Sequence, residues 1–473
     1  MADLRSTEQM DEHKDELKRV LGPGLLLLFI IGDILGTGIY ALTGTVAKEV
    51  GGMVWLPFLL AFTVAVMTAF AYLELVTKYP QAGGAAVYTN KAFKIGFLTF
   101  MVAFTVMASG ITSASTASRA FAENFMKGFG LESSGGLVTV IALSFIALVT
   151  AVNLWGVGES VKANIVLTVI ELSGLLIVIL VGVIAMANGR ADFSRTMVFE
   201  TPEDKSVFLA VSAATSVAFF AMVGFEDSVN MAEETKNPSQ IFPRIMLTGL
   251  MITGVIYVLV SLTAVAIVPI GELTKTGATP LLTVVQMGAP GLPFGAIFPF
   301  ISMFAVANTA LINMLMASRL LYGMAKQSIL PPVFGKVLRG RRTPWFAILF
   351  TSALAAILIT FVGQVSQLGG TTALLLLAVF TLTNVAVLVL RRDKVDHDHF
   401  RTPTWIPVVA GICTFYLVGP WTGRPLEQFS IALILLAIGA VLGVVTYFIN
   451  KAIRNRPTAI THEEYLQSDG TRN

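Results

Sequence analysis

The chain has 473 residues, of which 55% are hydrophobic and only 13% are charged, and its mean hydropathy is +0.78. Water-soluble globular proteins carry about a quarter charged residues, so this composition argues against a soluble enzyme or binding domain. The net charge of +3 is small and gives no indication of a nucleic-acid partner. Apolar runs of roughly twenty residues suffice to cross the hydrocarbon core of a bilayer as helices. The sequence therefore predicts an all-α integral membrane protein.

The N-terminal segment, residues 1–20, is rich in acidic residues and lacks the basic region and cleavage pattern of a signal peptide. We expect it to be a charged cytoplasmic lead-in. Twelve membrane spans are predicted after it, at 23–47, 53–77, 97–125, 136–154, 163–187, 207–232, 243–269, 294–325, 344–362, 368–390, 404–420 and 429–450. Residues 271–291 are too polar and too rich in proline to cross, so we expect a short helix lying on the surface there.

Lysine and arginine residues predict the orientation, because cytoplasmic loops carry an excess of them. Most of the 32 basic residues fall in loops on the same side as the N-terminus. We therefore expect a multi-pass protein of the cell membrane with both termini in the cytoplasm. The loops are too short to bury a core of their own, so any function must reside within the helix bundle.

The first span contains three glycines, Gly32, Gly36 and Gly38, together with Asp33 and Thr37. Each glycine costs a helix about 1 kcal/mol relative to alanine. Close packing of neighbouring helices is one explanation, because small residues four apart allow it. Packing alone does not require the polar residues Asp33 and Thr37, however, so the pattern favours an unwound break of the helix in mid-membrane.

The sixth span has a similar feature, because Gly224 is followed by Glu226 and Asp227 within an apolar segment. Two interrupted spans five helices apart indicate an inverted-repeat transporter with its binding site near the middle of the membrane. Unwound backbone can bind a zwitterion, since free N–H groups at a half-helix end attract its carboxylate and free carbonyls accept from its ammonium.

Four motifs resemble one known family. They are Gly-Asp-Ile-Leu-Gly-Thr-Gly-Ile at 32–39, Phe-Phe-Ala-Met-Val-Gly-Phe-Glu at 219–226 with its continuation through 244, Tyr-Pro-Gln-Ala-Gly-Gly at 79–84 with Tyr88, and Ser-Arg-Leu-Leu-Tyr-Gly-Met-Ala at 318–325. From about residue 21 to 450, the chain resembles the amino acid-polyamine-organocation (APC) superfamily, in its cationic-amino-acid-transporter-like branch. The sixth-span motif is the most specific of the four.

The resemblance implies a LeuT-like inverted repeat of two five-helix units plus two peripheral helices. Residues 21–190 would form the first repeat (helices 1–5) and residues 205–392 the second (helices 6–10). Residues 403–452 would form peripheral helices 11 and 12, followed by a cytoplasmic tail at 453–473.

The family's binding residues can be assigned by motif position to the two breaks at Gly36 and Gly224. The resemblance implies that the substrate carboxylate binds the backbone N–H groups of Thr37, Gly38 and Ile39. It implies that the amino group binds the carbonyls of Ile34, Phe220, Ala221 and Val223. Phe220 would also close the pocket as an aromatic gate, while Glu226 would support a helix end or a cytoplasmic gate.

Two acidic residues depart from the family pattern. Glu171 stands where proton-coupled relatives carry a lysine on the fifth helix, and Asp33 replaces a residue that is commonly small. We expect one or both to exchange a proton or to help hold a cation; the alternative is a neutral acid bonded to a neighbouring helix. Asp33 could instead recognise a cationic substrate side chain. Asn308 and Thr309 provide oxygens for Na⁺ as an alternative coupling ion.

We therefore predict a secondary active permease that moves an L-amino acid by alternating access, coupled to protons. The alternatives are sodium-coupled or exchange transport of cationic amino acids or polyamines, and, in another class, a channel or a non-transporting amino-acid sensor. No enzyme, cofactor or metal is predicted, because the spans contain no nucleophile–base set, phosphate loop or metal-ligand cluster. His397 and His399 flank Asp398 only in a charged loop, and the single cysteine, Cys413, excludes an internal disulfide.

Overall fold

The computed structural model describes residues 22–454, apart from 82, 133, 156, 233–234, 327–329, 339–340 and 342. These described residues form helices and connecting loops, with no β-strand among them. Ten helices are long and apolar enough to cross a membrane, and two shorter apolar helices, Trp345–Phe361 and Trp405–Val418, complete the predicted twelve. Residues 1–20 and most of the predicted tail at 453–473 lie outside the described residues.

The first five predicted spans correspond to six helices, because the first span is interrupted. They are α2 (Pro23–Ile34), α3 (Thr37–Val50), α4 (Trp55–Lys78), α6 (Gly96–Gly128), α7 (Gly135–Trp155) and α8 (Val157–Ala187). A further short helix, α5 (Gly84–Phe93), lies where only a loop was expected.

The sixth span is also interrupted and consists of α9 (Val207–Ala218) and two 3₁₀ turns, η2 (Phe219–Met222) and η3 (Asp227–Met231). The remaining spans are α10 (Pro238–Ile267), α13 (Phe294–Lys326), α14 (Trp345–Phe361), α15 (Val365–Leu390), α16 (Trp405–Val418) and α17 (Leu426–Arg454). Helix α10 starts five residues earlier than predicted, with Pro238 in its first turn. Proline is favoured there, because the N–H group that it lacks would have no acceptor within the helix.

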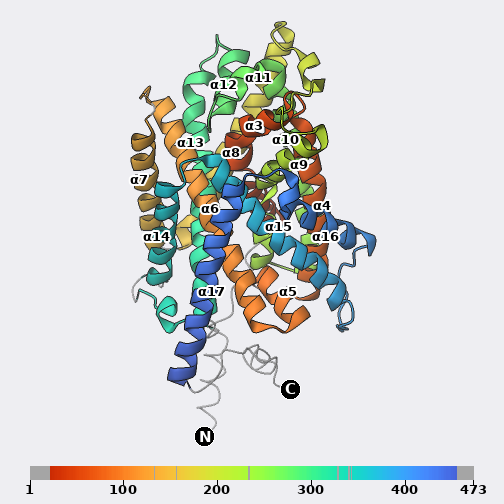
Figure 1. The fold of residues 1–473 in the computed structure, drawn as a ribbon, viewed down its shortest axis with the longest axis vertical. Coiled ribbons are helices and arrows are strands. Elements are labelled where there is room, and N and C mark those ends of the chain that lie inside the picture. Colours follow the sequence, from red (N-terminus) through yellow and green to blue (C-terminus); the bar gives the residue numbers. More distant parts are fainter. Residues whose placement is uncertain are drawn as a thin grey trace.

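The region at 271–291 differs from its prediction. It contains two short helices, α11 (Ile270–Leu273) and α12 (Pro280–Gly288), instead of one helix lying on a surface. Four apolar side chains of α12 are buried, namely Leu281, Leu282, Val284 and Val285. These two helices cover one end of the bundle, opposite to α5 (Figure 1). Packing against the long helices buries a segment whose polarity had suggested exposure.

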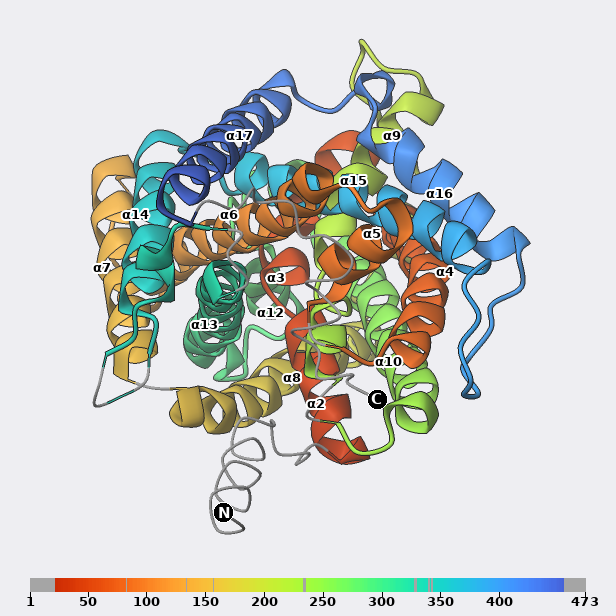
Figure 2. The same ribbon diagram turned by 90° about the horizontal axis from the view of Figure 1, so that it is seen from below.

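Burial separates an inner from an outer set of helices. In the most apolar stretch of Pro23–Val50, 78% of residues are buried within the protein, and in Val207–Asn230 the share is 72%. The corresponding share is only 22% in Leu426–Phe448. Seen from below, α7, α16 and α17 lie at the periphery, whereas α3 and α13 lie closer to the centre (Figure 2). Both interrupted spans therefore belong to the interior.

A dense set of hydrogen bonds ties α4 to the segment after α15. Arg391 donates two hydrogen bonds of 2.8 Å to the carboxylate of Glu74, which is only 2% exposed. The Thr402 N–H donates to the same carboxylate at 2.9 Å, and Lys78 donates to the Leu390 carbonyl at 2.6 Å. The hydrogen bonds to Glu74 raise the pKa of the Arg391 guanidinium. This charged contact fixes the α5 end of the bundle.

Candidate functional site

The first interruption lies between α2 and α3. Helical bonding continues through Leu35, whose N–H donates to the Ile31 carbonyl at 2.8 Å. Gly36 is then fully extended, with φ −172° and ψ −153°, and α3 starts at Thr37. The unwound segment that the glycines predict is therefore present, and it frees carbonyl groups at the end of α2 and N–H groups at the start of α3.

The second interruption follows η2. Val223 is extended and Gly224 has φ +126°, a conformation that residues with a side chain rarely adopt. A Cβ at Gly224 would also lie 2.5 Å from the carbonyl oxygen of Asp33. Glycine is thus required at position 224 for two reasons: its φ angle is positive, and the first interrupted helix approaches too closely for a side chain.

The two interrupted segments touch through their backbones. A Cβ at Gly38 would lie 2.4 Å from Cα of Ala221 and 2.8 Å from its nitrogen, so no side chain fits between them. Residues from the two halves of the chain that the family motifs had assigned to one site are therefore neighbours. Their use in substrate binding remains a prediction.

The freed groups of the first break have specific partners. The Tyr257 hydroxyl on α10 donates to the Ile34 carbonyl at 2.6 Å. The Thr37 N–H donates to the Thr309 hydroxyl at 3.3 Å. Tyr257 was missed by the sequence analysis, since one tyrosine in an apolar span carries no signal of its partner. Thr309 was expected near this break.

Both acids that depart from the family pattern are buried next to this break. Asp33 is 6% exposed and Glu171 is fully buried. A Cβ at Gly36 would lie 3.8 Å from Oε1 of Glu171. Within the described residues, Oε1 of Glu171, Oδ2 of Asp33 and the Thr37 hydroxyl have no hydrogen-bond partner. Because an ionised carboxylate is costly to bury without partners, the arrangement suits acids that take up a proton or a cation.

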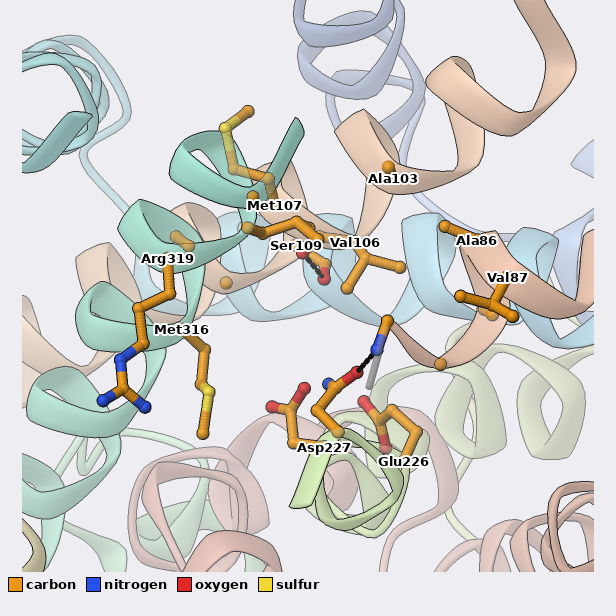
Figure 3. Close-up of a pocket in the computed structure, with 18 of the residues that line it drawn as sticks. Ala86, Val87, Ala103, Val106, Met107, Ser109, Glu226, Asp227, Met316 and Arg319 are labelled. Carbon is orange, nitrogen blue, oxygen red and sulfur yellow. Dashed lines mark hydrogen bonds between the residues drawn. The ribbon is translucent and has the colours of Figure 1, made fainter. Parts of the chain in front are cut away.

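A cavity of about 460 Å³ lies on the α5 side of the second break. It is lined by α5, the first half of α6, the second half of α13 and residues Val223, Glu226 and Asp227, but by no residue at 34–39. Figure 3 shows Arg319 of α13 on one side and Asp227 and Glu226 on the other. Glu226 also accepts a hydrogen bond from the Gly224 N–H at 2.9 Å, so it stabilises the break.

Metal binding has no support in the described part of the chain, where no group of three or more His, Cys, Asp or Glu side chains could hold an ion. His397 and His399 stand close together, with ring centroids 6.3 Å apart, but they lie in the loop between α15 and α16.

Comparison with known proteins agrees with this architecture. The family model described as amino acid permease matches residues 25–445. The chain is 30% identical to the methylthioribose transporter of Bacillus subtilis (strain 168), over 85% of this chain and 88% of that protein. It is 25% identical to the branched-chain amino acid permease BcaP of the same organism, over 92% and 93% of the two chains.

Another relative is the cationic amino acid transporter 9, chloroplastic, of Arabidopsis thaliana, with 32% identity over 68% of this chain and 58% of that protein. The family model spans both interrupted helices. Together with these relatives it confirms the resemblance drawn from the glycine and sixth-span motifs, and the relatives are transporters rather than enzymes. The chain belongs to the amino acid permease family.

Proposed function

We propose that the protein is a secondary active permease that moves an L-amino acid across the cell membrane by alternating access, together with a proton. The observation that carries this proposal is the contact between two unwound segments, at Gly36 and Gly224, inside the bundle. The family match supports transport. An amino acid between these segments would meet backbone donors and acceptors from both halves of the chain.

The start of α3 suits a substrate carboxylate. Thr37, Gly38 and Ile39 lie in its first turn, where backbone N–H groups have no carbonyl within the helix to bind, although the Thr37 N–H already donates to Thr309. The helix dipole adds a partial positive charge at the same end. By motif position, the carbonyls of Ile34, Phe220, Ala221 and Val223 would accept from the substrate ammonium, and that of Ile34 also accepts from Tyr257. Because Gly38 now touches Ala221, the segments must separate to admit a substrate.

Phe220 suits the role of a gate. A Cβ at Gly369 of α15 would lie 3.3 Å from the Phe220 ring, so the ring is packed between the second break and α15. Glu226 stands where the cavity meets the second break. With both termini in the cytoplasm, as the basic loops indicate, the cavity would open inward, and movement of Phe220 and Glu226 would connect it to the central site.

Asp33 and Glu171 are proposed as the coupling groups. Both carboxylates are buried beside the first break, and each has an oxygen without a hydrogen-bond partner in the described structure. Proton uptake removes the cost of burying the charge and lets the segment close. Sodium is the alternative, with Thr309 among the oxygens available to it. If the coupling is to protons, pH-driven uptake should be lost in Asp33→Asn, in Glu171→Gln or in both; unchanged uptake in both variants would contradict the proposal.

The decisive experiment is uptake into proteoliposomes, with proton and sodium gradients imposed separately. The substrate panel includes alanine, serine, leucine, arginine, lysine and a polyamine. It also includes methylthioribose, because a relative that matches most of the chain is named for that solute. Uptake of an amino acid driven by an inward proton gradient, with accelerated exchange against internal substrate, is expected.

Other outcomes select among the alternatives. Uptake of methylthioribose alone would assign a different substrate class to the same transport mechanism. Uptake that responds only to sodium would replace the proton proposal. Flux without accelerated exchange would indicate a channel, and binding without flux would indicate a sensor; either result overturns the permease.

A further inference from the structure

The side-chain amide of Asn308, on α13, contacts two other helices, α8 and α2. Its oxygen accepts a hydrogen bond of 3.0 Å from the Asn164 amide of α8. Its nitrogen lies 3.2 Å from the Gly32 carbonyl of α2, 3.4 Å from the Thr168 hydroxyl and 3.4 Å from Oε2 of Glu171. A backbone carbonyl can only accept, so the Gly32 contact identifies which amide atom is the nitrogen.

This nitrogen has fewer hydrogens than acceptors. An amide NH₂ group provides two donors, whereas three oxygens lie within bonding distance. At any moment, one of the three oxygens must go without a full hydrogen bond. An acceptor with a negative charge forms a bond roughly twice as strong as a neutral one. The charge on Glu171 therefore decides how the two hydrogens are shared.

The Gly32 carbonyl depends on Asn308 because of the helix break. In a continuous helix its partner would be the N–H of Gly36, four residues later. That bond is absent, because Gly36 is extended at the break. The same Asn308 nitrogen thus serves a carbonyl released by the break and the nearby acid. Within the described residues it is also the sole hydrogen-bond donor to the Glu171 carboxylate, since Oε1 has no partner.

We propose that Asn308 is the positioning residue that links the charge of Glu171 to the conformation of the first helix break. When Glu171 is ionised, one N–H of Asn308 is committed to it, and the Gly32 carbonyl and Thr168 compete for the other. When Glu171 is protonated, both N–H groups are available to Gly32 and Thr168, and α2 is held more firmly against α13 and α8. The inference rests on the proposed proton coupling through Glu171.

Other titratable groups face Glu171, and their charges also affect whether it is protonated. Asp33 comes from α2, Tyr40 from α3 and Tyr257 from α10. The Tyr40 hydroxyl donates to the Glu171 backbone carbonyl at 2.6 Å rather than to its carboxylate. On α13 the neighbours are Asn308 and Thr309, which do not titrate. Asp33 is therefore the facing acid whose charge adds directly to that of Glu171.

The test is the pH profile of substrate exchange in proteoliposomes with equal pH on both sides. Asn308→Ala removes the donor that favours ionised Glu171, so the midpoint of the profile should move to higher pH by about one unit. Thr168→Val removes the competing acceptor while keeping the side-chain shape, so the midpoint should move to lower pH. These opposite shifts distinguish positioning from a structural role, which would lower the rate at every pH without moving the midpoint.

Asn124→Ala is the matched control, because this buried asparagine on α6 donates to its own helix, at the Ala120 carbonyl, and should leave the midpoint unchanged. If Asn308→Ala fails to fold, the isosteric Thr168→Val still decides the question. Unchanged midpoints in Asn308→Ala and Thr168→Val overturn the inference.

Glu171→Gln distinguishes a failure of the Asn308 role from a failure of proton coupling through Glu171. If this variant loses its pH dependence while Asn308→Ala and Thr168→Val keep the wild-type midpoint, Glu171 carries the proton and the role of Asn308 is wrong. If Glu171→Gln keeps the wild-type profile, proton coupling through Glu171 fails and the role of Asn308 fails with it. In the double variant, Asn308→Ala should add no shift to Glu171→Gln.

Discussion

The contact between the two breaks can be tested by adding a single methyl group, in the variant Gly38→Ala. Gly38 lies within α3 and needs no unusual backbone angle, so the substitution changes packing alone. The new Cβ would lie 2.4 Å from Cα and 2.6 Å from Cβ of Ala221. Carbon atoms in contact normally stay about 3.5–4.0 Å apart, so the segments must separate by about 1 Å.

This separation carries a measurable cost. Overpacking typically costs about 1–3 kcal/mol, and the upper value applies here because backbone atoms of Ala221 cannot rotate away. A cost of about 3 kcal/mol on the closed state lowers the equilibrium population of that state roughly a hundredfold. We expect the initial rate of uptake in proteoliposomes to fall by about ten- to a hundredfold, while the protein still folds.

Gly411→Ala is the control, because a Cβ at Gly411 in α16 would be 3.5 Å from the Asn384 side chain, an ordinary contact. Thermal stability in detergent should be compared for both variants, so that misfolding is separated from a defect in transport. If Gly38→Ala folds and transports within about twofold of Gly411→Ala, the backbone contact is not part of the transport cycle.

Three further changes follow from individual contacts. Tyr257→Phe removes a donor to the buried Ile34 carbonyl, which costs about 1–3 kcal/mol, so uptake should fall by about five- to a hundredfold. Arg391→Ala leaves the carboxylate of Glu74 buried without its cation; the free energy of unfolding should fall by about 3 kcal/mol, seen as a lower melting temperature in detergent. Gly224→Ala forces a side chain onto a backbone with φ +126° and should abolish uptake.

Matched substitutions serve as references for these three. Tyr447→Phe changes an exposed tyrosine of α17, and Arg392→Ala removes the exposed neighbour of Arg391. Both should behave like the wild type, and Gly411→Ala is again the reference for Gly224→Ala. Wild-type uptake in Tyr257→Phe or Gly224→Ala, or an unchanged melting temperature in Arg391→Ala, would contradict the corresponding contact.

The twelve spans and the positions of both breaks could be predicted from the sequence. Each membrane helix must satisfy its own backbone hydrogen bonds in lipid, so its extent is encoded in a local apolar run. Glycines beside polar residues, as at Gly36 and Gly224, encode the breaks equally locally. The short helix α5 and the buried position of α12 were not predicted, because their apolar residues become buried only against helices distant in the chain.

Only the tertiary structure decided which polar groups meet at the first break. Tyr257 is 223 residues from Ile34 and Asn308 is 137 from Glu171, and no local pattern connects such positions. Their contact depends on how α10, α13 and α8 are rotated and packed around α2. The sequence thus determined where the backbone loses its helical bonds, because that is a local property. Packing determined which side chains replace them, because that depends on the relative placement of whole helices.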